Sequence, residues 1–363
     1  MISLASPFSR QAAPLLGIDI SSSSIKLVEL GREKDGTLVL ERCAIEVLEK
    51  GWIVDGNVER FDDVCEALRR LVKKSGTRTR NVAMALPSSA VITKKIVLPG
   101  GLNEQELEVQ VESEASQYIP FSLDEVSLDF CVIGVSPGSF EDIEVLIAAS
   151  RKEKVQDRQG LAEAAGLKPV VLDIESHAAR LAAARLAENT PGVAKSPKDS
   201  LVALLKIGGV ASTLQVMRND EIVYERDQPF GGSQLTQLIV RQYGFSAEEA
   251  EVKKRNADLP EDYATAVLAP FVESTAVEIG RALQFFFTST PYNKVDHILL
   301  AGGSAALPGL PEAVAQQAGF GCSVANAFEG MTLGAGVRSS ARTLRDASTY
   351  LTACGLAMRR FVK

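Results

Sequence analysis

Alternating apolar and polar positions at the start of the chain predict a β-meander. An apolar run at 15–20 is interrupted by one acid, Asp19, and four serines follow it at 21–24. Residues 25–30 mix apolar and charged side chains, as a half-buried strand does. An Asp-Gly pair then predicts a hairpin turn into a third strand at 38–47. The chain therefore begins with three strands joined by tight turns.

A spacing of three and four residues between apolar positions predicts the first helix, which Gly76 ends. A compact α+β unit follows, whose helix begins at a capping box made by Asn103 and Glu106. The buried face of this helix is expected to contain Leu107, Val111, Ala115 and Tyr118. Strands are expected at 81–86, 91–98, 126–135 and 143–149. One helix among several short strands is typical of a small inserted subdomain.

The opening pattern returns after a polar stretch at 189–198 that contains two prolines and a glycine. After this boundary, an apolar strand at 201–207 carries one charge, Lys206, and leads into a small-residue turn at 208–212. Asp19 and Lys206 therefore occupy equivalent places in two copies of one pattern. Such a duplication predicts two lobes with a cleft between them, and one turn from each lobe facing the other.

The rest of the chain is predicted to be mostly helical, with a few further strands. Gly231 and Gly232 open one helix, and Ser246 with Glu249 forms a second capping box. Helices are expected at 152–165, 177–187, 231–241, 267–287, 308–318, 331–337 and 350–361. Further strands are expected at 169–175, 213–217, 221–226 and 295–300.

Composition fits a two-lobed protein of a reducing compartment. A chain of 363 residues is too long for one ordinary core, and 46% hydrophobic with 23% charged residues is typical of a folded globular protein. The net charge of −7 argues against nucleic-acid binding. The five cysteines are scattered, so we expect all of them to be small buried hydrophobes rather than metal ligands. No apolar stretch suits a signal peptide or a membrane span, which predicts a cytoplasmic protein that meets a membrane through partners.

Three small-residue turns follow apolar strands, at 21–24, 208–212 and 302–304. Backbone N–H groups of such turns can hold phosphate oxygens, and small side chains let a phosphate approach. Lys26 lies just past the first turn as a candidate cation, and Asp19 could hold a magnesium ion through water. An ordinary β-turn would explain any one of these turns, but three of them in a duplicated context favour a nucleotide site. The chain has no GxxxxGK[ST] loop, which excludes a P-loop NTPase.

Two segments resemble the phosphate and adenosine motifs of the superfamily that contains actin, the heat-shock chaperone ATPases and FtsA. They are GIDISSSSIK at 17–26 and ILLAGGSAALPGL at 298–310. Four further segments are similar to the PilM family of type IV pilus assembly proteins: QYIPF at 117–121, DEV at 124–126, QPFGG at 228–232 and LQFFF at 283–287. The resemblance extends from about residue 15 to the C-terminus.

This resemblance implies a duplicated, two-lobed α/β fold of the actin-like ATPase type, in its FtsA-like form, with four subdomains. Subdomain 1A would comprise 1–79, 151–190 and 340–363, and the α+β insert at 80–150 would be subdomain 1C. Subdomain 2A would comprise 199–228 and 294–339, and subdomain 2B would comprise 229–293.

The resemblance also implies a role and a set of site residues. Members of the family are cytoplasmic, ATP-binding parts of the pilus inner-membrane platform that hold the N-terminal segment of PilN, with PilO and the pilus assembly ATPases as further partners. ATP and Mg²⁺ are the implied cofactors. The phosphates would contact Asp19, Ser21, Ser22, Ser23 and Lys26, and then Gly208, Gly209 and Ser212 of the second turn. The adenosine would face Gly302, Gly303 and Ser304, with Gly231, Gly232 and Lys253 also near the nucleotide.

One departure from the superfamily pattern concerns hydrolysis. The second phosphate strand usually carries an acid where this chain has Lys206. A protonated lysine cannot hold a metal ion, although it can pair with a phosphate oxygen. We therefore expect ATP binding with slow or absent hydrolysis. The alternative is that Lys206 points away and the site is degenerate.

Three other functions remain open at this point. An ATPase or phosphotransferase would need a general base, for which Asp173 and Glu175 are the candidates at a strand end. A membrane-division linker like FtsA would need an amphipathic C-terminal anchor, and the last residues offer only a weak one. A nucleotide-free adaptor would keep the fold without the site.

Overall fold

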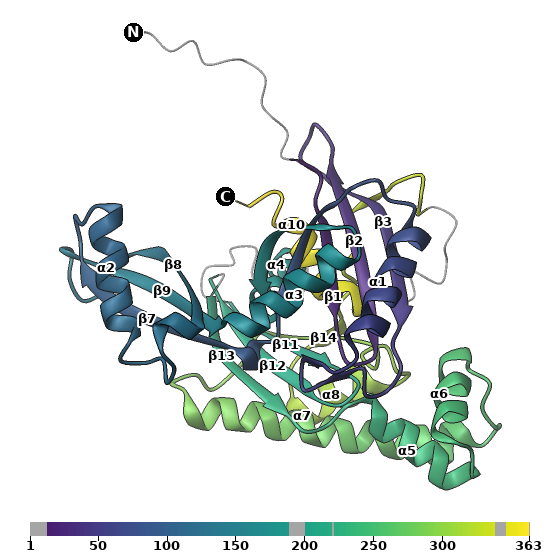
Figure 1. Ribbon diagram of the computed structural model, residues 1–363. Coiled ribbons are helices and arrows are strands. Elements are labelled where there is room, and N and C mark those ends of the chain that lie inside the picture. The colour runs from purple at the N-terminus through teal and green to yellow at the C-terminus, as the bar shows by residue number, and fades with distance from the viewer. Residues whose placement is uncertain (1–12, 189–199, 220, 338–345, 363) are drawn as a thin grey trace.

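Two mixed β-sheets, each containing a three-stranded meander, form the centres of two lobes (Figure 1). The computed structural model describes residues 13–188, 200–219, 221–337 and 346–362. The first sheet has the strand order β10-β6-β1-β2-β3-β16. Its strands are β1 (Leu16–Ile20), β2 (Ser24–Arg32), β3 (Leu38–Val47), β6 (Asn81–Leu86), β10 (Lys168–Ile174) and β16 (Thr332–Leu333). β1, β2 and β3 are antiparallel, whereas β6 runs parallel to both β1 and β10.

The second sheet repeats this topology, in the order β13-β12-β11-β14-β15. Its strands are β11 (Leu201–Ile207), β12 (Ser212–Arg218), β13 (Glu221–Gln228), β14 (His297–Ala301) and β15 (Cys322–Val324). The meander is again antiparallel, and β14 runs parallel to β11 as β6 does to β1. Asp19 and Lys206 are each the second-last residue of the first meander strand. The duplication read from the sequence is therefore confirmed, together with the equivalence of these two positions.

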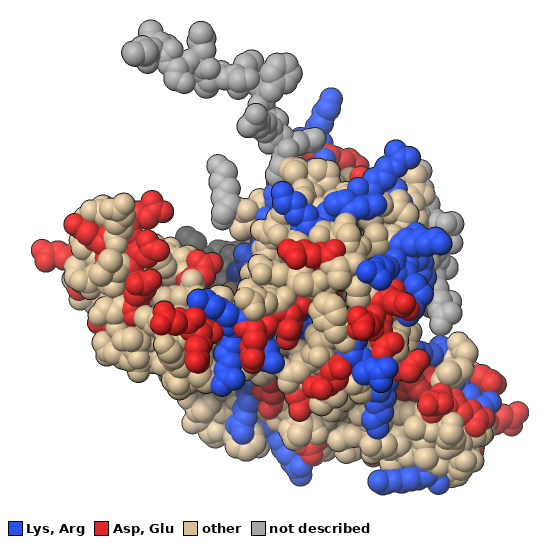
Figure 2. Space-filling model, viewed as in Figure 1, with Lys and Arg blue, Asp and Glu red and all other residues tan. Residues whose placement is uncertain are grey.

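An inserted α+β unit projects from the first lobe, at the left in Figure 1. It contains α2 (Glu104–Ala115) and a sheet of β7 (Val91–Pro99), β9 (Asp142–Arg151) and β8 (Val126–Val135). Asn103 and Glu106 form the expected capping box. Figure 2 shows acidic side chains gathered on this unit, where Glu104, Glu108 and Glu112 are exposed. The unit has its own core, so it is a separate packing unit within the first lobe.

The remaining helices cover the two large sheets. The first lobe contains α1 (Phe61–Ser75), α3 (Lys152–Ala164), α4 (Glu175–Ala187) and α10 (Leu351–Met358). The second lobe contains α5 (Gly232–Tyr243), α6 (Ala247–Asn256), α7 (Ala269–Ser289) and α8 (Leu310–Ala318). Short elements are β4 (Ile53–Val54), β5 (Asn57–Val58), the 3₁₀ turns Ser88–Ala90, Leu123–Glu125 and Ala347–Tyr350, and the π-helical turn Ala264–Leu268.

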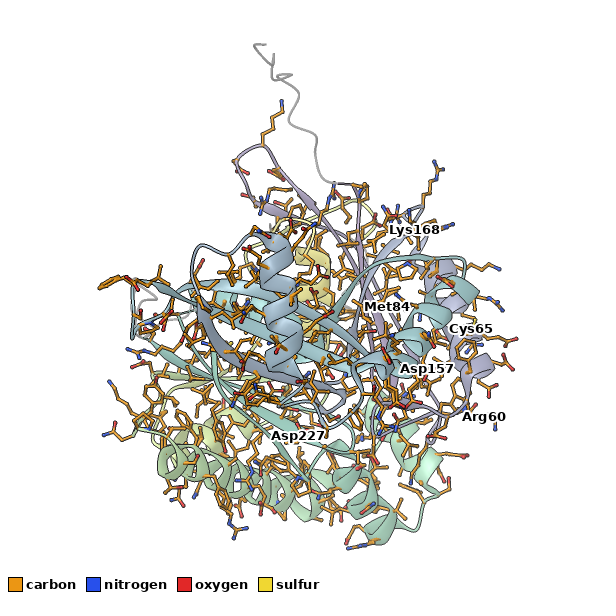
Figure 3. The ribbon with its side chains drawn as sticks, turned by 60° about the vertical axis from the view of Figure 1, so that its left-hand side comes forward. Arg60, Cys65, Met84, Asp157, Lys168 and Asp227 are labelled. Carbon is orange, nitrogen blue, oxygen red and sulfur yellow. The ribbon has the colours of Figure 1, made fainter. Side chains whose placement is uncertain are left out.

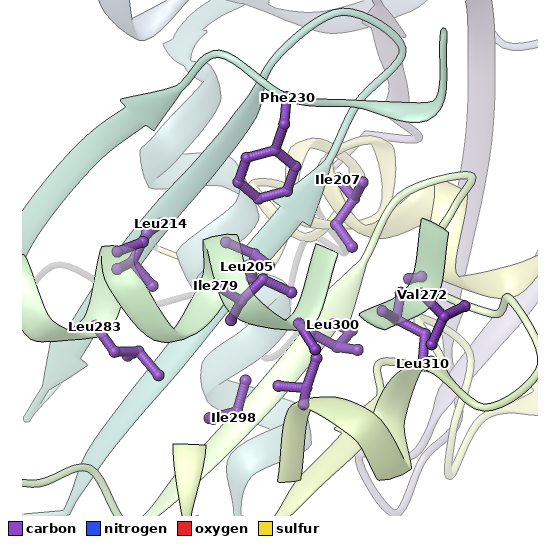
Figure 4. Close-up of a cluster of buried hydrophobic side chains, with 14 of the residues drawn as sticks. Leu205, Ile207, Leu214, Phe230, Val272, Ile279, Leu283, Ile298, Leu300 and Leu310 are labelled. Atoms are coloured by element: carbon purple, nitrogen blue, oxygen red, sulfur yellow. The ribbon is translucent and has the colours of Figure 1, made fainter. Parts of the chain in front are cut away.

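Each lobe has its own hydrophobic core. In the first lobe, Met84 of β6 and Cys65 of α1 belong to one buried cluster between the sheet and its outer helices (Figure 3). In the second, Leu205 and Leu214 of the sheet pack against Ile279 on α7 (Figure 4). Periodic apolar residues on a helix thus bury one stripe against the alternating face of a strand.

A third core joins the lobes and lies around α10 and α4. α10 lies so close to β1 that a Cβ at Gly17 would be 2.0 Å from the Ala353 carbonyl oxygen. A Cβ at Gly355 would be 1.7 Å from the Ala178 carbonyl oxygen of α4. α10 is thus a buried element, with every residue from Leu351 to Ala357 inside. α10 therefore lacks the exposed apolar face that an amphipathic membrane anchor would need.

The structure corrects several sequence-based expectations. Residues 331–337 are not helical: they contain β16, which returns to the first lobe and pairs with β3. β6 lies in the first large sheet, so the insert's own sheet begins at β7 and not at residue 80. Tyr118 lies beyond α2 and is 43% exposed, because α2 ends at Ala115 and Ile119 turns inward in its place. Cys131 is exposed on β8, although the other cysteines are buried or partly buried and all five are free. The expected lobe boundary at 189–198 lies outside the described residues.

The close approach at Gly355 makes a direct prediction. Gly355→Ala should destabilise the protein by about 3 kcal/mol or more, because the new methyl group overlaps a backbone carbonyl that cannot rotate away. Gly160→Ala in α3 is the matched control, since its Cβ would lie 3.7 Å from the Phe61 ring, an ordinary contact. That variant should gain up to about 1 kcal/mol from helix propensity. Urea unfolding of both variants measures this difference, and equal stabilities would contradict the close packing.

Candidate functional site

The first small-residue turn joins β1 to β2 and is supported by a buried ion pair. Asp19 and Lys26 are register partners on the two strands, so their side chains lie on the same face. Lys26 Nζ lies 3.1 Å from Asp19 Oδ2 and donates to Ser21 Oγ at 2.8 Å. Ser21 in turn donates to the Ser24 carbonyl at 3.0 Å. Lys26 therefore stabilises the turn and neutralises Asp19 at the same time.

The second turn lies between β11 and β12 and is held by the start of α5. The Gly232 and Ser233 N–H groups donate to the Gly208 and Gly209 carbonyls at 2.9 and 2.8 Å. A Cβ at Gly231 would lie 2.7 Å from both of these carbonyl oxygens, so this position requires glycine. Gly231 and Gly232 thus allow the first turn of α5 to pack directly against the small-residue turn at 208–209.

The two turns face each other across the lobes, as the duplication predicts. A Cβ at Gly209 would lie 3.5 Å from Ser22 Oγ and 3.8 Å from Ser23 Cβ. These are ordinary contact distances, so the two turns approach each other to about the width of one methyl group, and no side chain at 209 lies between them. The turns therefore form a small-residue cradle of the kind that suits phosphate oxygens.

The third turn follows β14 and closes onto the second. Gly302 has φ +99°, and a Cβ there would lie 2.2 Å from the Ile207 carbonyl oxygen. Its N–H donates to the Ser348 carbonyl at 2.9 Å, which fixes the turn against the 3₁₀ turn that precedes α10. Ser304 Oγ would lie 2.5 Å from a Cβ at Gly232, whereas Gly303 faces open space. All three turns named by the sequence are thus brought to one place.

Two of the expected residues lie away from the cradle. Ser212 is fully buried and donates to the Phe230 carbonyl at 2.7 Å, so it holds the second turn from behind. Lys253 Nζ pairs with Asp258 at 3.2 Å and lies over the Phe245 ring. The neighbouring Lys254 instead donates to the Gly232 carbonyl at 3.4 Å. Consecutive residues of a helix point about 100° apart around its axis, and the sequence did not show whether Lys253 or Lys254 points toward the cradle.

Lys206 crosses from the second lobe to the first. Its Nζ forms an ion pair with Oε1 of Glu175, the first residue of α4. Burial alone would lower the pKa of Lys206, but the nearby carboxylates of Glu175 and Asp19 raise it above its ordinary value. The lysine is therefore protonated at neutral pH, and it points into the junction between the lobes and not away from it.

The two candidate general bases are both engaged in ion pairs. Glu175 pairs with Lys206, and Asp173 accepts two hydrogen bonds from Arg359 at 2.5 and 2.8 Å. Arg359 follows α10, so this pair also ties the end of the chain to the first sheet. Carboxylate oxygens that already accept hydrogen bonds from a cation are less available to bind and orient an attacking water. This arrangement gives no support to an efficient hydrolase.

The residues present fit phosphate groups better than a metal ion. The cradle offers small residues and the ammonium groups of Lys26 and Lys206, which suit anions. Within the described ranges, no group of three or more His, Cys, Asp or Glu side chains gathers to hold a metal. Asp19, the expected Mg²⁺ residue, already pairs with Lys26.

A groove that the sequence did not indicate lies between the insert and the first lobe. It encloses a cavity of about 280 Å³. Its apolar lining consists of Ala90, Ile92, Ile119, Phe121, Val126 and Ala149. Its polar lining consists of Asp55, Asn57, Ser89, Ser150, Arg151 and Lys154. The Arg151 guanidinium lies 4.1 Å from the Phe121 ring centroid. A smaller neighbouring cavity contains Arg158, whose buried Nη1 has no hydrogen-bond partner among the described residues.

Comparisons with known proteins agree with this architecture. Residues 17–361 match the family described as type IV pilus assembly protein PilM. The chain is 28% identical to a structure titled "PilM-PilN type IV pilus biogenesis complex", covering 97% of this chain and 100% of that one with a TM-score of 0.78. Two more distant structures share the fold. They are the ethanolamine utilization protein EutJ from Carboxydothermus hydrogenoformans (17% identity, 95% and 89% coverage, TM-score 0.56) and a glycerol dehydratase reactivase (9% identity, 97% and 100% coverage, TM-score 0.52).

The Lys206–Glu175 ion pair predicts a measurable coupling between the lobes. Lys206→Met should cost about 1–3 kcal/mol, because it leaves a partly buried carboxylate without its cation. Adding Glu175→Gln to this variant should recover most of the loss, which a double-mutant cycle of urea unfolding measures.

The matched control is Lys95, which forms a 2.6 Å ion pair with Glu221 between the insert and the second lobe. The side chains of both residues in this pair are 43% exposed. Lys95→Met should therefore change stability by less than about 1 kcal/mol. Losses of similar size for the two lysines would show that the Lys206 pair has no special role.

Proposed function

The chain belongs to the type IV pilus assembly protein PilM family, and we propose that it is a nucleotide-binding scaffold that docks the N-terminal segment of a PilN-type membrane protein. The observation that carries the nucleotide part is the convergence of three small-residue turns from both lobes. Ser22, Gly209 and Ser304 lie around one cradle, although they are far apart in the sequence. The relative titled as a PilM-PilN complex supports the partner.

In this proposal each part of the nucleotide contacts a different part of the chain. The turns at 21–24 and 208–209 would hold the phosphates through backbone N–H groups and the Lys26 ammonium. The turn at 302–304 would face the adenosine, with Gly303 leaving open space beside it. ATP is the nucleotide that we propose, and its effect would be to fix the relative position of the two lobes.

Hydrolysis is expected to be slow or absent. Both strand-end carboxylates are held in ion pairs, and Lys206 takes the place of an acid. In a site of this kind the nucleotide is a structural ligand that stabilises one arrangement of the lobes, and its hydrolysis is not needed. This separates a scaffold from an ATPase on the same fold.

The groove between the insert and the first lobe is where we place the PilN segment. An extended peptide suits an apolar channel with polar groups at its rim, since side chains enter the channel and the backbone pairs with the rim. Arg151 and Lys154 at the rim offer donors for the carbonyl groups of such a peptide. Docking there would hold the protein at the cytoplasmic face of the inner membrane through PilN, with PilO and the pilus assembly ATPases as further partners. Within the described residues, no helix is long and apolar enough to cross a bilayer.

The nucleotide proposal predicts binding without turnover. Purified protein should show saturable ATP binding by calorimetric titration, and incubation with excess ATP and magnesium should release no phosphate beyond about one equivalent per site. Gly209→Val is the test variant, because its side chain would enter the cradle beside Ser22 and abolish binding. Sustained release of phosphate by the wild-type protein would contradict a structural role for the nucleotide.

The docking proposal predicts a sharp difference between two substitutions on β7. Ile92→Glu places a carboxylate in the apolar groove and should weaken binding of a synthetic PilN N-terminal peptide by about tenfold or more. Val97→Glu is the matched control, because Val97 lies on the same strand, is 55% exposed and does not line the groove. Fluorescence anisotropy measures both affinities, and equal losses would place the peptide elsewhere.

A further inference from the structure

Two carboxylates near the phosphate turns are each paired with a cation that belongs to the chain itself. Asp19 lies 3.1 Å from Lys26 Nζ, and Glu175 lies in direct contact with Lys206 Nζ. A magnesium ion is held in proteins by carboxylates, usually through part of its water shell, and an ammonium group at the same carboxylate excludes it by repulsion and by occupying the site. The residues at this site therefore do not fit a resident divalent cation.

The position of Lys206 is a second reason why the site does not fit a divalent cation. It is the second-lobe equivalent of Asp19, second from the end of its strand. A metal-dependent site would gain from two acids at these equivalent places, whereas this chain has one acid and one ammonium group. The change from a carboxylate to an ammonium group moves the charge at this position by two units, from attraction of a cation to attraction of an anion.

Lys206 also has the capacity to contact a phosphate. An ammonium group has three donors, and Glu175 takes one of them. The nearby carboxylates of Glu175 and Asp19 raise its pKa and keep it protonated. Glu225 also faces Lys206 from β13, so its surroundings contain acids from both lobes.

We propose that this site binds its nucleotide without a divalent metal ion, and that the Lys206 ammonium takes the place of the metal beside the phosphates. The inference rests on the proposed function, because it assigns a charge partner to a nucleotide whose binding is itself a proposal. It gives Lys206 a defined task, which is to neutralise phosphate charge at the junction of the lobes. Glu175 acts as a competing anion that holds the lysine when no phosphate is near.

Calorimetric titration with ATP, in EDTA and in excess Mg²⁺, tests the inference. The wild-type protein should bind ATP in EDTA within about threefold of its affinity in Mg²⁺. Glu175→Gln should bind ATP more tightly in EDTA, by about threefold to tenfold, because the competing carboxylate is gone. Lys206→Asp should bind weakly in EDTA and gain about tenfold or more when Mg²⁺ is added. Lys95→Met, which breaks the exposed pair between the insert and the second lobe, should behave as the wild type.

The outcomes separate the inference from the function on which it depends. Wild-type binding that is lost in EDTA and restored by Mg²⁺ would overturn the metal-free site while leaving nucleotide binding intact. No ATP binding in either buffer, by protein that still binds the PilN peptide, would overturn both and leave a plain adaptor. Circular dichroism verifies that each variant is folded. If Lys206→Asp does not fold, the wild-type comparison and Glu175→Gln still decide the question.

Discussion

The close packing of α10 against β1 and α4 is the constraint on which the arrangement of the molecule depends. Gly17 and Gly355 leave no room for a methyl group at these crossings, because backbone atoms of the neighbouring element lie about where a Cβ would be. The cluster around α10 contains residues of both large sheets, including Val28 of β2 and Leu204 of β11. A core shared in this way fixes the position of the two lobes relative to each other, so that a turn from each lobe faces a turn from the other.

The ion pairs at the junction define what the site can do. Lys26 with Asp19 and Lys206 with Glu175 leave cationic groups facing the cradle, and Asp173, the other candidate base, is paired with Arg359. Such a site suits the binding of a phosphate better than its transfer, as the proposed function requires. This physical character fits the proposed scaffold, whose shape would be set by a bound nucleotide, and the groove proposed for the PilN segment lies elsewhere, beside the insert.

The sequence predicted most elements well where local chemistry decides them. Period-two and helical patterns located nearly all strands and helices, and the Asn103–Glu106 capping box formed as expected. Prediction was wrong at 331–337, where β16 pairs with β3 from far away in the chain. It was also wrong for Tyr118, because α2 ends at Ala115 and the chain then turns. The contact that decides β16 is remote in sequence, whereas Tyr118 depends on a helix end that the spacing of apolar residues did not show.

For the candidate site, the sequence by itself determined the chemistry of the turns, the duplication and the equivalence of Asp19 with Lys206. These follow from residue type and spacing, which tertiary contacts do not change. Only the tertiary structure decided that Glu175 pairs with Lys206, that Lys254 and not Lys253 reaches Gly232, and that a groove opens beside the insert. The reason is that ion pairs and cavities depend on the distance between elements remote in sequence, and periodicity fixes the face of a residue but not what lies opposite it.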